Sequence, residues 1–257
     1  MDPADTNRRR LALLLASGVG AAGLLPRGAA FAAGAACERA PRETAGPFPG
    51  NGTNTSGGRI VNALDDEGIV RSDIRSSFGR STTRAPGVPL ELTVALADSR
   101  NGCAPLAGHA IHVWHADRSG DYSLYQGQAA RENYLRGVQL TDAEGRARFV
   151  TIYPSCYGGR YPHIHFEVFR PMGGPFRSAD TASHRLLVSQ LAMPADHCAA
   201  VYGSADGYEG SRSNFARMRL ETDGVFRDNS PAQRAAMTPR LQGDVGTGFR
   251  GSILVAL

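Results

Sequence analysis

The chain has 257 residues, a length that suits one substantial domain and is short for two. Its net charge is +4, every basic residue is arginine, and no dense basic cluster follows the first ten residues, so the composition argues against a nucleic-acid-binding protein. Charged residues make up 20% of the chain, and the 31 glycines and 15 prolines favour a loop-rich globular protein over a helical bundle.

The segment 1–32 has the pattern of an export signal. The sequence Asn-Arg-Arg-Arg at 7–10 precedes an apolar run that contains several glycines, and Ala-Phe-Ala at 30–32 provides a cleavage site. The run is too short to span a membrane. Paired arginines before a weakly apolar stretch predict the twin-arginine route, with an ordinary secretory signal as the alternative. We therefore expect a protein that acts outside the cytoplasm and has no membrane segment after processing.

Four cysteines follow this segment, at Cys37, Cys103, Cys156 and Cys198. An even number in an exported chain predicts two disulfides, for which three pairings are possible. No Cys-x-x-Cys spacing occurs, which argues against a thiolate zinc site. We expect Cys156 to bond Cys198, because a bridge there would anchor the loop that carries Tyr157, and Cys37 to bond Cys103.

An all-β fold is predicted, with a β-sandwich over 86–257 that follows an N-terminal arm and loops over 33–85. Apolar residues alternate with smaller or polar ones from Val88 to Leu96, as in a strand with one buried face. A Gly-containing turn at 141–145 predicts a hairpin. The expected strands are 88–96, 110–115, 134–140, 146–152, 163–169, 186–193, 215–220 and 249–255. No long amphipathic helix or internal repeat is evident, which favours a sandwich.

The densest functional pattern is Tyr-Gly-Gly-Arg-Tyr-Pro-His-Ile-His-Phe at 157–166. In a strand, His163 and His165 share a face because side chains alternate, so the two imidazoles could bind one metal ion or form a structural pair. Tyr157 lies on a Gly-rich loop that can bring it back to the same point, and Tyr122 follows the end of a predicted strand. These tyrosines favour the metal site.

A tyrosine ligand restricts the identity of the metal. The phenol pKa is about 10, so binding as phenolate needs a strongly polarising cation. Anionic oxygen donors combined with two neutral imidazoles favour iron(III) over zinc or copper(I). Such a centre is suited to activating an organic substrate rather than to holding reduced iron for oxygen.

A series of motifs extends this pattern along the chain. They are Glu-Thr-Ala-Gly-Pro-Phe at 43–48, Val-Trp-His-Ala-Asp at 113–117, Gly-Asp-Tyr-Ser at 120–123, Leu-Arg-Gly-Val-Gln-Leu-Thr-Asp at 135–142, and Tyr-Pro-Ser-Cys-Tyr at 153–157. With these motifs in this order, the chain resembles the intradiol ring-cleavage dioxygenases, which include catechol 1,2- and protocatechuate 3,4-dioxygenases. It is most like their exported bacterial branch, and the resemblance runs from about Glu43 to Gln190.

The resemblance implies the roles of individual residues. The implied ligands of Fe(3+) are Tyr122, Tyr157, His163 and His165. Tyr157 would be released when the substrate binds, while Tyr122 would stay bound. Arg160 would face the bound ring and stabilise negative charge there, and Gln190 would lie near the histidines. The family often has Arg-Pro-Ala where this chain has Arg-Tyr-Pro at 160–162. By strand alternation Tyr161 shares the face of the two histidines, so it could line the pocket or compete as a ligand.

The resemblance also implies a reaction. A catechol would bind through both oxygens, give one proton to Tyr157, and be opened by O2 to a cis,cis-muconate-type diacid. One alternative is a non-catalytic extracellular β-sandwich that binds aromatic polymer or carbohydrate, and another is a copper or zinc hydrolase that uses only the histidine pair. The chain lacks the N-terminal helical segment that pairs subunits of catechol 1,2-dioxygenases. We therefore expect a monomer or a small homo-oligomer.

Overall fold

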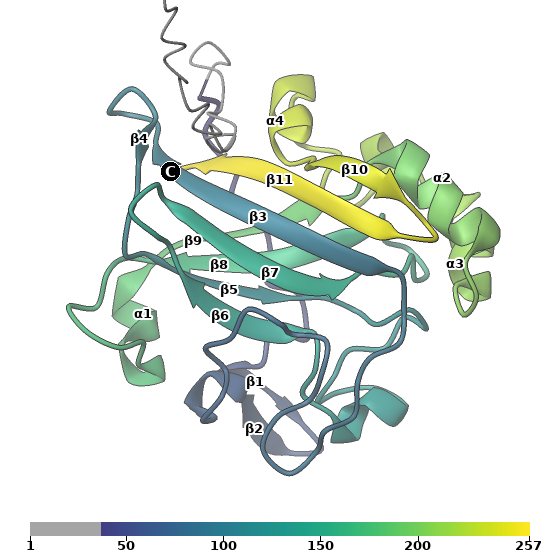
Figure 1. Cartoon of the computed structure of the whole chain (residues 1–257), viewed down its shortest axis with the longest axis horizontal. Coiled ribbons are helices and arrows are strands. Elements are labelled where there is room, and N and C mark those ends of the chain that lie inside the picture. The colour runs from purple at the N-terminus through teal and green to yellow at the C-terminus, as the bar shows by residue number, and fades with distance from the viewer. Residues whose placement is uncertain (1–36) are drawn as a thin grey trace, which may run out of the picture. The chain divides into compact units, whose positions relative to one another are not determined.

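Two β-sheets lie face to face in the computed structural model, which describes residues 37–257 (Figure 1). The first sheet contains β10 (Arg240–Asp244), β11 (Gly248–Ala256), β3 (Pro89–Asp98), β4 (Ala104–Pro105) and β7 (Arg146–Ile152). The second contains, in order, β6 (Arg136–Leu140), β5 (Ala110–Trp114), β8 (His163–Phe169) and β9 (Arg185–Ala192). Within the sheets β11 pairs parallel with β3 and the other pairs are antiparallel. The predicted all-β sandwich is confirmed, whereas the hairpin predicted at 141–145 is wrong, because β6 and β7 lie in different sheets.

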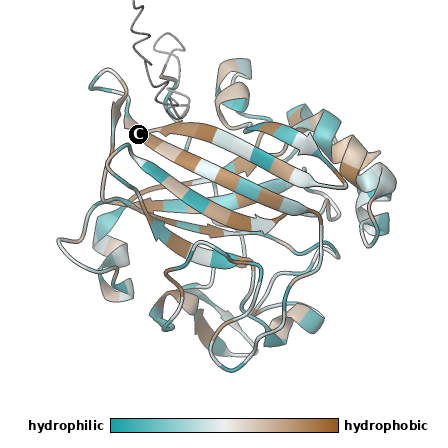
Figure 2. Cartoon of the chain, in the orientation of Figure 1, coloured by the Kyte–Doolittle hydropathy of each residue, from teal (hydrophilic) through white to brown (hydrophobic). Residues whose placement is uncertain are grey.

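The hydrophobic core lies between the two sheets. Leu90, Leu92, Val94 and Leu96 of β3 are each no more than 1% exposed. They belong to the same buried cluster as Ile164, Phe166 and Val168 of β8. Apolar and polar residues alternate along β3 and β11 in Figure 2, as expected for strands of which one face is buried. The predicted export signal at 1–32 and the start of the predicted arm lie outside the described residues.

The outer face of the second sheet is also buried. In antiparallel sheets it is common for one face to pack on the core and for the other to face solvent. All seven residues of β8 are buried, including the polar His163, His165 and Glu167. The N-terminal arm covers them. Its Glu43 N–H donates to the Val188 carbonyl over 2.8 Å, and its Asn51 side chain donates to Glu167 over 2.9 Å. The arm therefore keeps the histidine face of β8 away from bulk water.

The predicted strand at 215–220 is wrong. This segment contains the end of helix α3 (Glu209–Phe215) and leads into a 3₁₀ helix, η4 (Leu220–Thr222). Met218 and Leu220 alternate with arginines and so imitate a strand, but they and Phe215 pack on the buried cluster around Tyr161. The other helices are α1 (Thr181–His184), α2 (Ala195–Ser204) and α4 (Pro231–Ala236), with 3₁₀ helices η1 (Ala63–Asp65), η2 (Gln128–Arg131) and η3 (Ser178–Asp180). Within residues 37–257, no helix is both long and apolar enough to cross a bilayer.

Elements that the sequence pattern did not reveal are short or polar. They are β4, the hairpin of β1 (Asn51–Ser56) and β2 (Arg59–Asn62), the edge strand β10, and the four α-helices. The longest of these helices has 10 residues. Such elements carry too few periodic apolar positions to be recognised from the sequence.

One of the two predicted disulfides is present. Cys37 and Cys103 are bonded, with Cα atoms 5.9 Å apart. The predicted bond between Cys156 and Cys198 is wrong, because both are free and buried. The Cys198 sulfur lies 3.2 Å from the Tyr153 hydroxyl, whereas the Cys156 thiol donates to the Arg160 carbonyl over 3.5 Å. Burial raises the pKa of Cys156 to about 12, so this thiol stays protonated.

Candidate active site

Two histidines at the start of β8 form the base of the candidate site. Their Nε2 atoms are 3.1 Å apart, and their rings are nearly perpendicular. His163 Nδ1 lies 2.6 Å from the Tyr161 carbonyl, which can only accept a hydrogen bond. The proton therefore belongs on Nδ1, and the Nε2 lone pair of His163 is directed at the centre.

Two tyrosines converge on the same point from loops. The hydroxyls of Tyr122 and Tyr157 each lie 3.2 Å from His163 Nε2 and 3.3 Å from one another. Tyr122 follows a turn at Gly120, whose φ of +102° favours glycine; a Cβ there would lie 3.4 Å from the Tyr157 Cβ. The structure thus brings together Tyr122, Tyr157, His163 and His165, as the resemblance implies.

The loop that carries Tyr122 is anchored by a buried arginine. Arg136 donates to the Ser123 hydroxyl over 2.9 Å, to the Ser123 carbonyl over 2.8 Å and to the Pro49 carbonyl over 2.9 Å. It therefore ties the Tyr122 loop to the arm. Tyr122 itself is 1% exposed, whereas Tyr157 is partly exposed beside Gly158 and Gly159.

The four donor groups are neutral in the absence of a cation. Burial, and then the charge of Arg160, lowers the pKa of His163 to about 3. Burial, and then His163, lowers the pKa of His165 well below its ordinary value. Burial raises the pKa of both tyrosines, that of Tyr122 most strongly. Only a strongly polarising cation would make these phenols ionise in so dry a site.

The donor set fits an iron(III) ion. The single lone pair of His163 Nε2 faces two phenols and a second imidazole, more groups than one acceptor can satisfy. Ligand atoms that share a first-row metal ion at about 2.0–2.1 Å lie roughly 3–3.4 Å apart, as these atoms do. No group of three or more His, Cys, Asp or Glu side chains suited to a metal occurs within residues 37–257. A metal site at this point therefore depends on the tyrosines.

The His165 ring is held by packing rather than by a hydrogen bond. It stacks on Trp114 at 5.0 Å between ring centroids, and Trp114 stacks in turn on His112 at 4.8 Å. Within residues 37–257, His165 Nδ1 has no hydrogen-bond partner. Gly46 of the arm lies close to the His165 ring, since a Cβ at this glycine would lie 3.3 Å from the imidazole. Trp114 thus supports the site through its stacking on His165.

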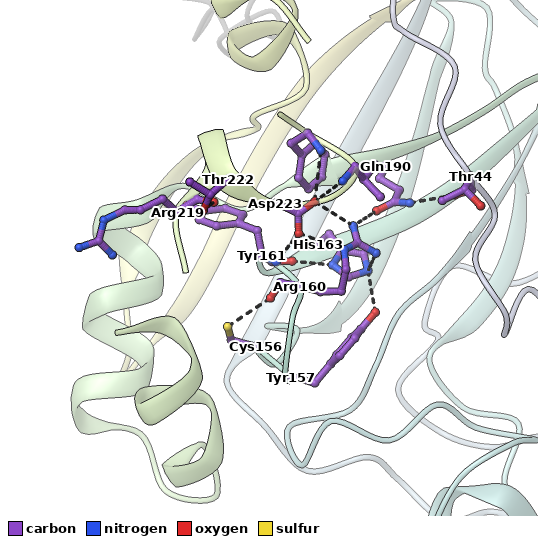
Figure 3. A network of polar contacts seen from close by, with 12 residues as sticks. Thr44, Cys156, Tyr157, Arg160, Tyr161, His163, Gln190, Arg219, Thr222 and Asp223 are labelled. Atoms are coloured by element: carbon purple, nitrogen blue, oxygen red, sulfur yellow. Dashed lines mark hydrogen bonds and ion pairs between the residues drawn. The ribbon is translucent and has the colours of Figure 1, made fainter. Parts of the chain in front are cut away.

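Arg160 lies at the edge of the four-donor cluster (Figure 3). Its Nη1 is 3.4 Å from His163 Nε2, and its Nη2 donates to Gln190 Oε1 over 2.6 Å. Gln190 lies opposite His165 in the pairing of β8 with β9, and its amide donates to the Thr44 carbonyl over 2.8 Å. Gln190 therefore contacts the arginine rather than the four donor atoms.

Tyr161 does not take either of the roles that the sequence left open for it. Its ring points away from His163 in Figure 3. It packs in a separate buried cluster with Ala192, Phe226 and Met237. Pro162 and the short connection to β8 turn this side chain out of the histidine face, so strand alternation does not extend back to it.

Asp223, which the sequence analysis missed, completes the surroundings of Arg160. It is fully buried and accepts from Arg160 Nε over 3.0 Å and from the Tyr161 N–H over 2.7 Å. Burial opposes ionisation of Asp223, but these hydrogen bonds and the Arg160 charge outweigh it and lower the pKa. Asp223 follows η4 in a loop more than sixty positions after Arg160. No local pattern marks it as part of the site.

Comparisons with known proteins match the chain to one family. A family model described as Dioxygenase matches residues 73–207, more than half of the chain. The protocatechuate 3,4-dioxygenase beta chain of Burkholderia cepacia is 37% identical over 106 residues, which cover 37% of this chain and 41% of that protein. Catechol 1,2-dioxygenase 1 of Acinetobacter lwoffii is 31% identical over 111 residues, 36% of this chain and 32% of that protein.

The chain belongs to the intradiol ring-cleavage dioxygenase family. The matched segments span less than half of the two curated relatives. An intradiol ring-cleavage dioxygenase from Tetranychus urticae shares the fold, with a TM-score of 0.64, 22% identity, and coverage of 86% of this chain and 94% of that one. The dioxygenase domain of a carbohydrate-binding fusion protein from Streptomyces sp. SirexAA-E has a TM-score of 0.51 and 23% identity, and the match covers 86% of this chain and 98% of that one.

Proposed function

We propose that this protein is an iron(III) dioxygenase that opens catechol-type rings between the two hydroxyl-bearing carbons. The observation that carries the proposal is the convergence of two phenol oxygens and the His165 Nε2 atom, each within 3.2 Å of His163 Nε2. Membership of the family supports the same reaction. When bound, iron(III) supplies a Lewis acid that draws electron density from the ring and makes it reactive toward dioxygen.

The two tyrosines differ in a way that supports different roles. Tyr122 is buried and its loop is fixed by Arg136, so we assign it to permanent binding of the metal. Tyr157 is partly exposed and is followed by two glycines, so its side chain can move without disturbing the core. If released from the metal, the Tyr157 phenolate would be the group that accepts a proton from a catechol hydroxyl.

Arg160 supplies the positive charge at the site. One of its N–H groups is directed at the four-donor cluster from a site that is largely dry, where a fixed charge stabilises developing negative charge most strongly. Asp223 and Gln190 already occupy the Nε and Nη2 groups of this guanidinium, so it is poorly placed to form a bidentate pair with a carboxylate on the substrate. We therefore place uncharged catechols ahead of carboxylated ones, such as the substrate named for the Burkholderia relative.

The reaction makes a definite prediction about the product. One turnover of catechol should incorporate both atoms of one O2 into cis,cis-muconate, which absorbs in the ultraviolet. Mass spectrometry of the product formed under ¹⁸O2 checks this, with an anaerobic sample as the control. A yellow semialdehyde would identify extradiol cleavage instead. Iron binding without oxygen uptake on any catechol would support the alternative of a non-catalytic binding protein.

We also propose that the protein is exported and that its mature chain begins near Ala33. The twin-arginine pattern at 7–10 supports export. Because the twin-arginine route carries folded proteins, it would allow the metal to be inserted before export. Replacing Arg8 and Arg9 together with lysine should stop export, as measured by the fraction of protein outside the cytoplasm and by N-terminal sequencing. Undiminished export of the double variant would assign the segment to the general secretory route.

A further inference from the structure

The buried carboxylate of Asp223 binds two separate parts of the site at once. Its Oδ2 accepts from the Tyr161 N–H over 2.7 Å and from Arg160 Nε over 3.0 Å. Its Oδ1 accepts from the Val225 N–H over 2.8 Å and from Arg160 Nη2 over 3.5 Å. The Val225 contact, with one from the Phe226 N–H, fixes the carboxylate in its own loop. The orientation of the Asp223 carboxylate is therefore fixed by its own loop, independently of Arg160.

In this arrangement the N–H groups of Arg160 point in two different directions. The Nε and Nη2 edge is taken by Asp223, and Nη2 is also taken by Gln190. Nη1 is the group that remains directed at the candidate metal site, 3.4 Å from His163 Nε2. Because a guanidinium is planar and rigid, fixing two of its nitrogens fixes the third. The carboxylate thereby determines which N–H group faces the site.

The same carboxylate also supports His163 through the backbone. The Tyr161 peptide donates its N–H to Asp223, while the Tyr161 carbonyl lies 2.6 Å from His163 Nδ1. The ring of Phe226, three residues after Asp223, packs against Tyr161 and lies 6.0 Å from the guanidinium carbon of Arg160. The loop that follows η4 is thus joined to both Arg160 and His163 by short contacts.

We infer that Asp223 is a positioning residue of the dioxygenase site, which holds the Arg160 guanidinium so that Nη1 faces the bound substrate. For its effect on turnover, the inference rests on the proposed function. The predicted effect of Asp223 on the orientation of Arg160 does not rest on the proposed function, because it concerns only contacts between side chains of this protein. Outer-sphere partners of this kind typically contribute a 10- to 100-fold effect on activity.

The test compares Asp223→Asn with Asp228→Asn, a matched change in the same loop at a side chain that is 83% exposed. In Asp223→Asn we expect kcat per bound iron to fall about 10- to 100-fold with a smaller change in KM, because the arginine acts after the substrate is bound. Iron content and the visible absorption band should stay close to those of the unmodified protein. Asp223→Glu, which restores the charge, should recover part of the loss.

A second measurement does not depend on iron or activity. Phenylglyoxal modifies accessible guanidinium groups, and mass spectrometry of the metal-free protein gives the rate at Arg160. This rate should rise several-fold in Asp223→Asn and stay unchanged in Asp228→Asn. An unchanged rate overturns the inference, and so does a raised rate with undiminished turnover per iron. If the unmodified protein opens no catechol, the proposed function fails and the labelling rates alone decide whether Asp223 positions Arg160.

Discussion

Replacing His163 with alanine should leave the purified protein colourless and reduce its iron content to less than about a tenth of that of the unmodified protein, with loss of ring cleavage. The His163 Nε2 atom is the common neighbour of both phenol oxygens and of His165 Nε2. Removing it leaves two neutral phenols and one imidazole, a set that lacks a strong donor at its centre. Metal analysis and the visible spectrum after iron loading measure the result.

His109→Ala is the matched control for this experiment. His109 lies outside the site, and its Nδ1 contacts the Ala107 carbonyl in an exposed loop. This variant should keep its iron and colour. Thermal unfolding of both variants in the metal-free state would show whether His163→Ala retains the fold. A folded His163→Ala protein with full iron and an unchanged visible band would rule out His163 as a ligand.

The strands that frame the site follow from sequence periodicity. The structure has β7 over Arg146–Ile152 and β8 over His163–Phe169, the bounds that the apolar alternation predicts. Period-two alternation also places His163 and His165 on one face. The same argument fails for Tyr161, because alternation applies only within a strand, and β8 begins at His163.

Other parts of the site depend on contacts between distant segments. The sequence does not reveal that the arm buries the outer face of β8, since the Asn51 contact with Glu167 joins positions that no periodicity relates. The positions of Tyr122 and Tyr157 near a strand end and on a Gly-rich loop make them candidates, but only the family motifs assign both as ligands. Asp223 belongs to no such motif and lies in a loop, so only the folded chain brings it to Arg160. Side chains that act through a neighbouring residue are the ones that sequence reasoning misses.

Replacing Arg160 with alanine should preserve the iron and the colour but lower turnover about 100-fold or more, the scale of one lost electrostatic donor. Arg160 is not one of the four converging donors, and its Nη1 approaches them from the side at 3.4 Å from His163 Nε2. The loss should appear mainly in kcat, because the guanidinium stabilises charge that develops during the reaction. Steady-state kinetics per bound iron give the measurement, and the exposed Arg219→Ala serves as the control.

The interpretation of Arg160→Ala is complicated by Asp223, which this change leaves buried without its ion-pair partner. Breaking a buried ion pair by removing one member commonly costs about 3–5 kcal/mol of stability. The double variant Arg160→Ala with Asp223→Asn separates the two effects, because it removes the unpaired carboxylate as well. If turnover stays about 100-fold low while thermal stability recovers, the guanidinium itself acts on the substrate. Recovery of turnover in the double variant would instead show that the single change acts through the stranded charge, and Arg160 would then have no direct part in ring cleavage.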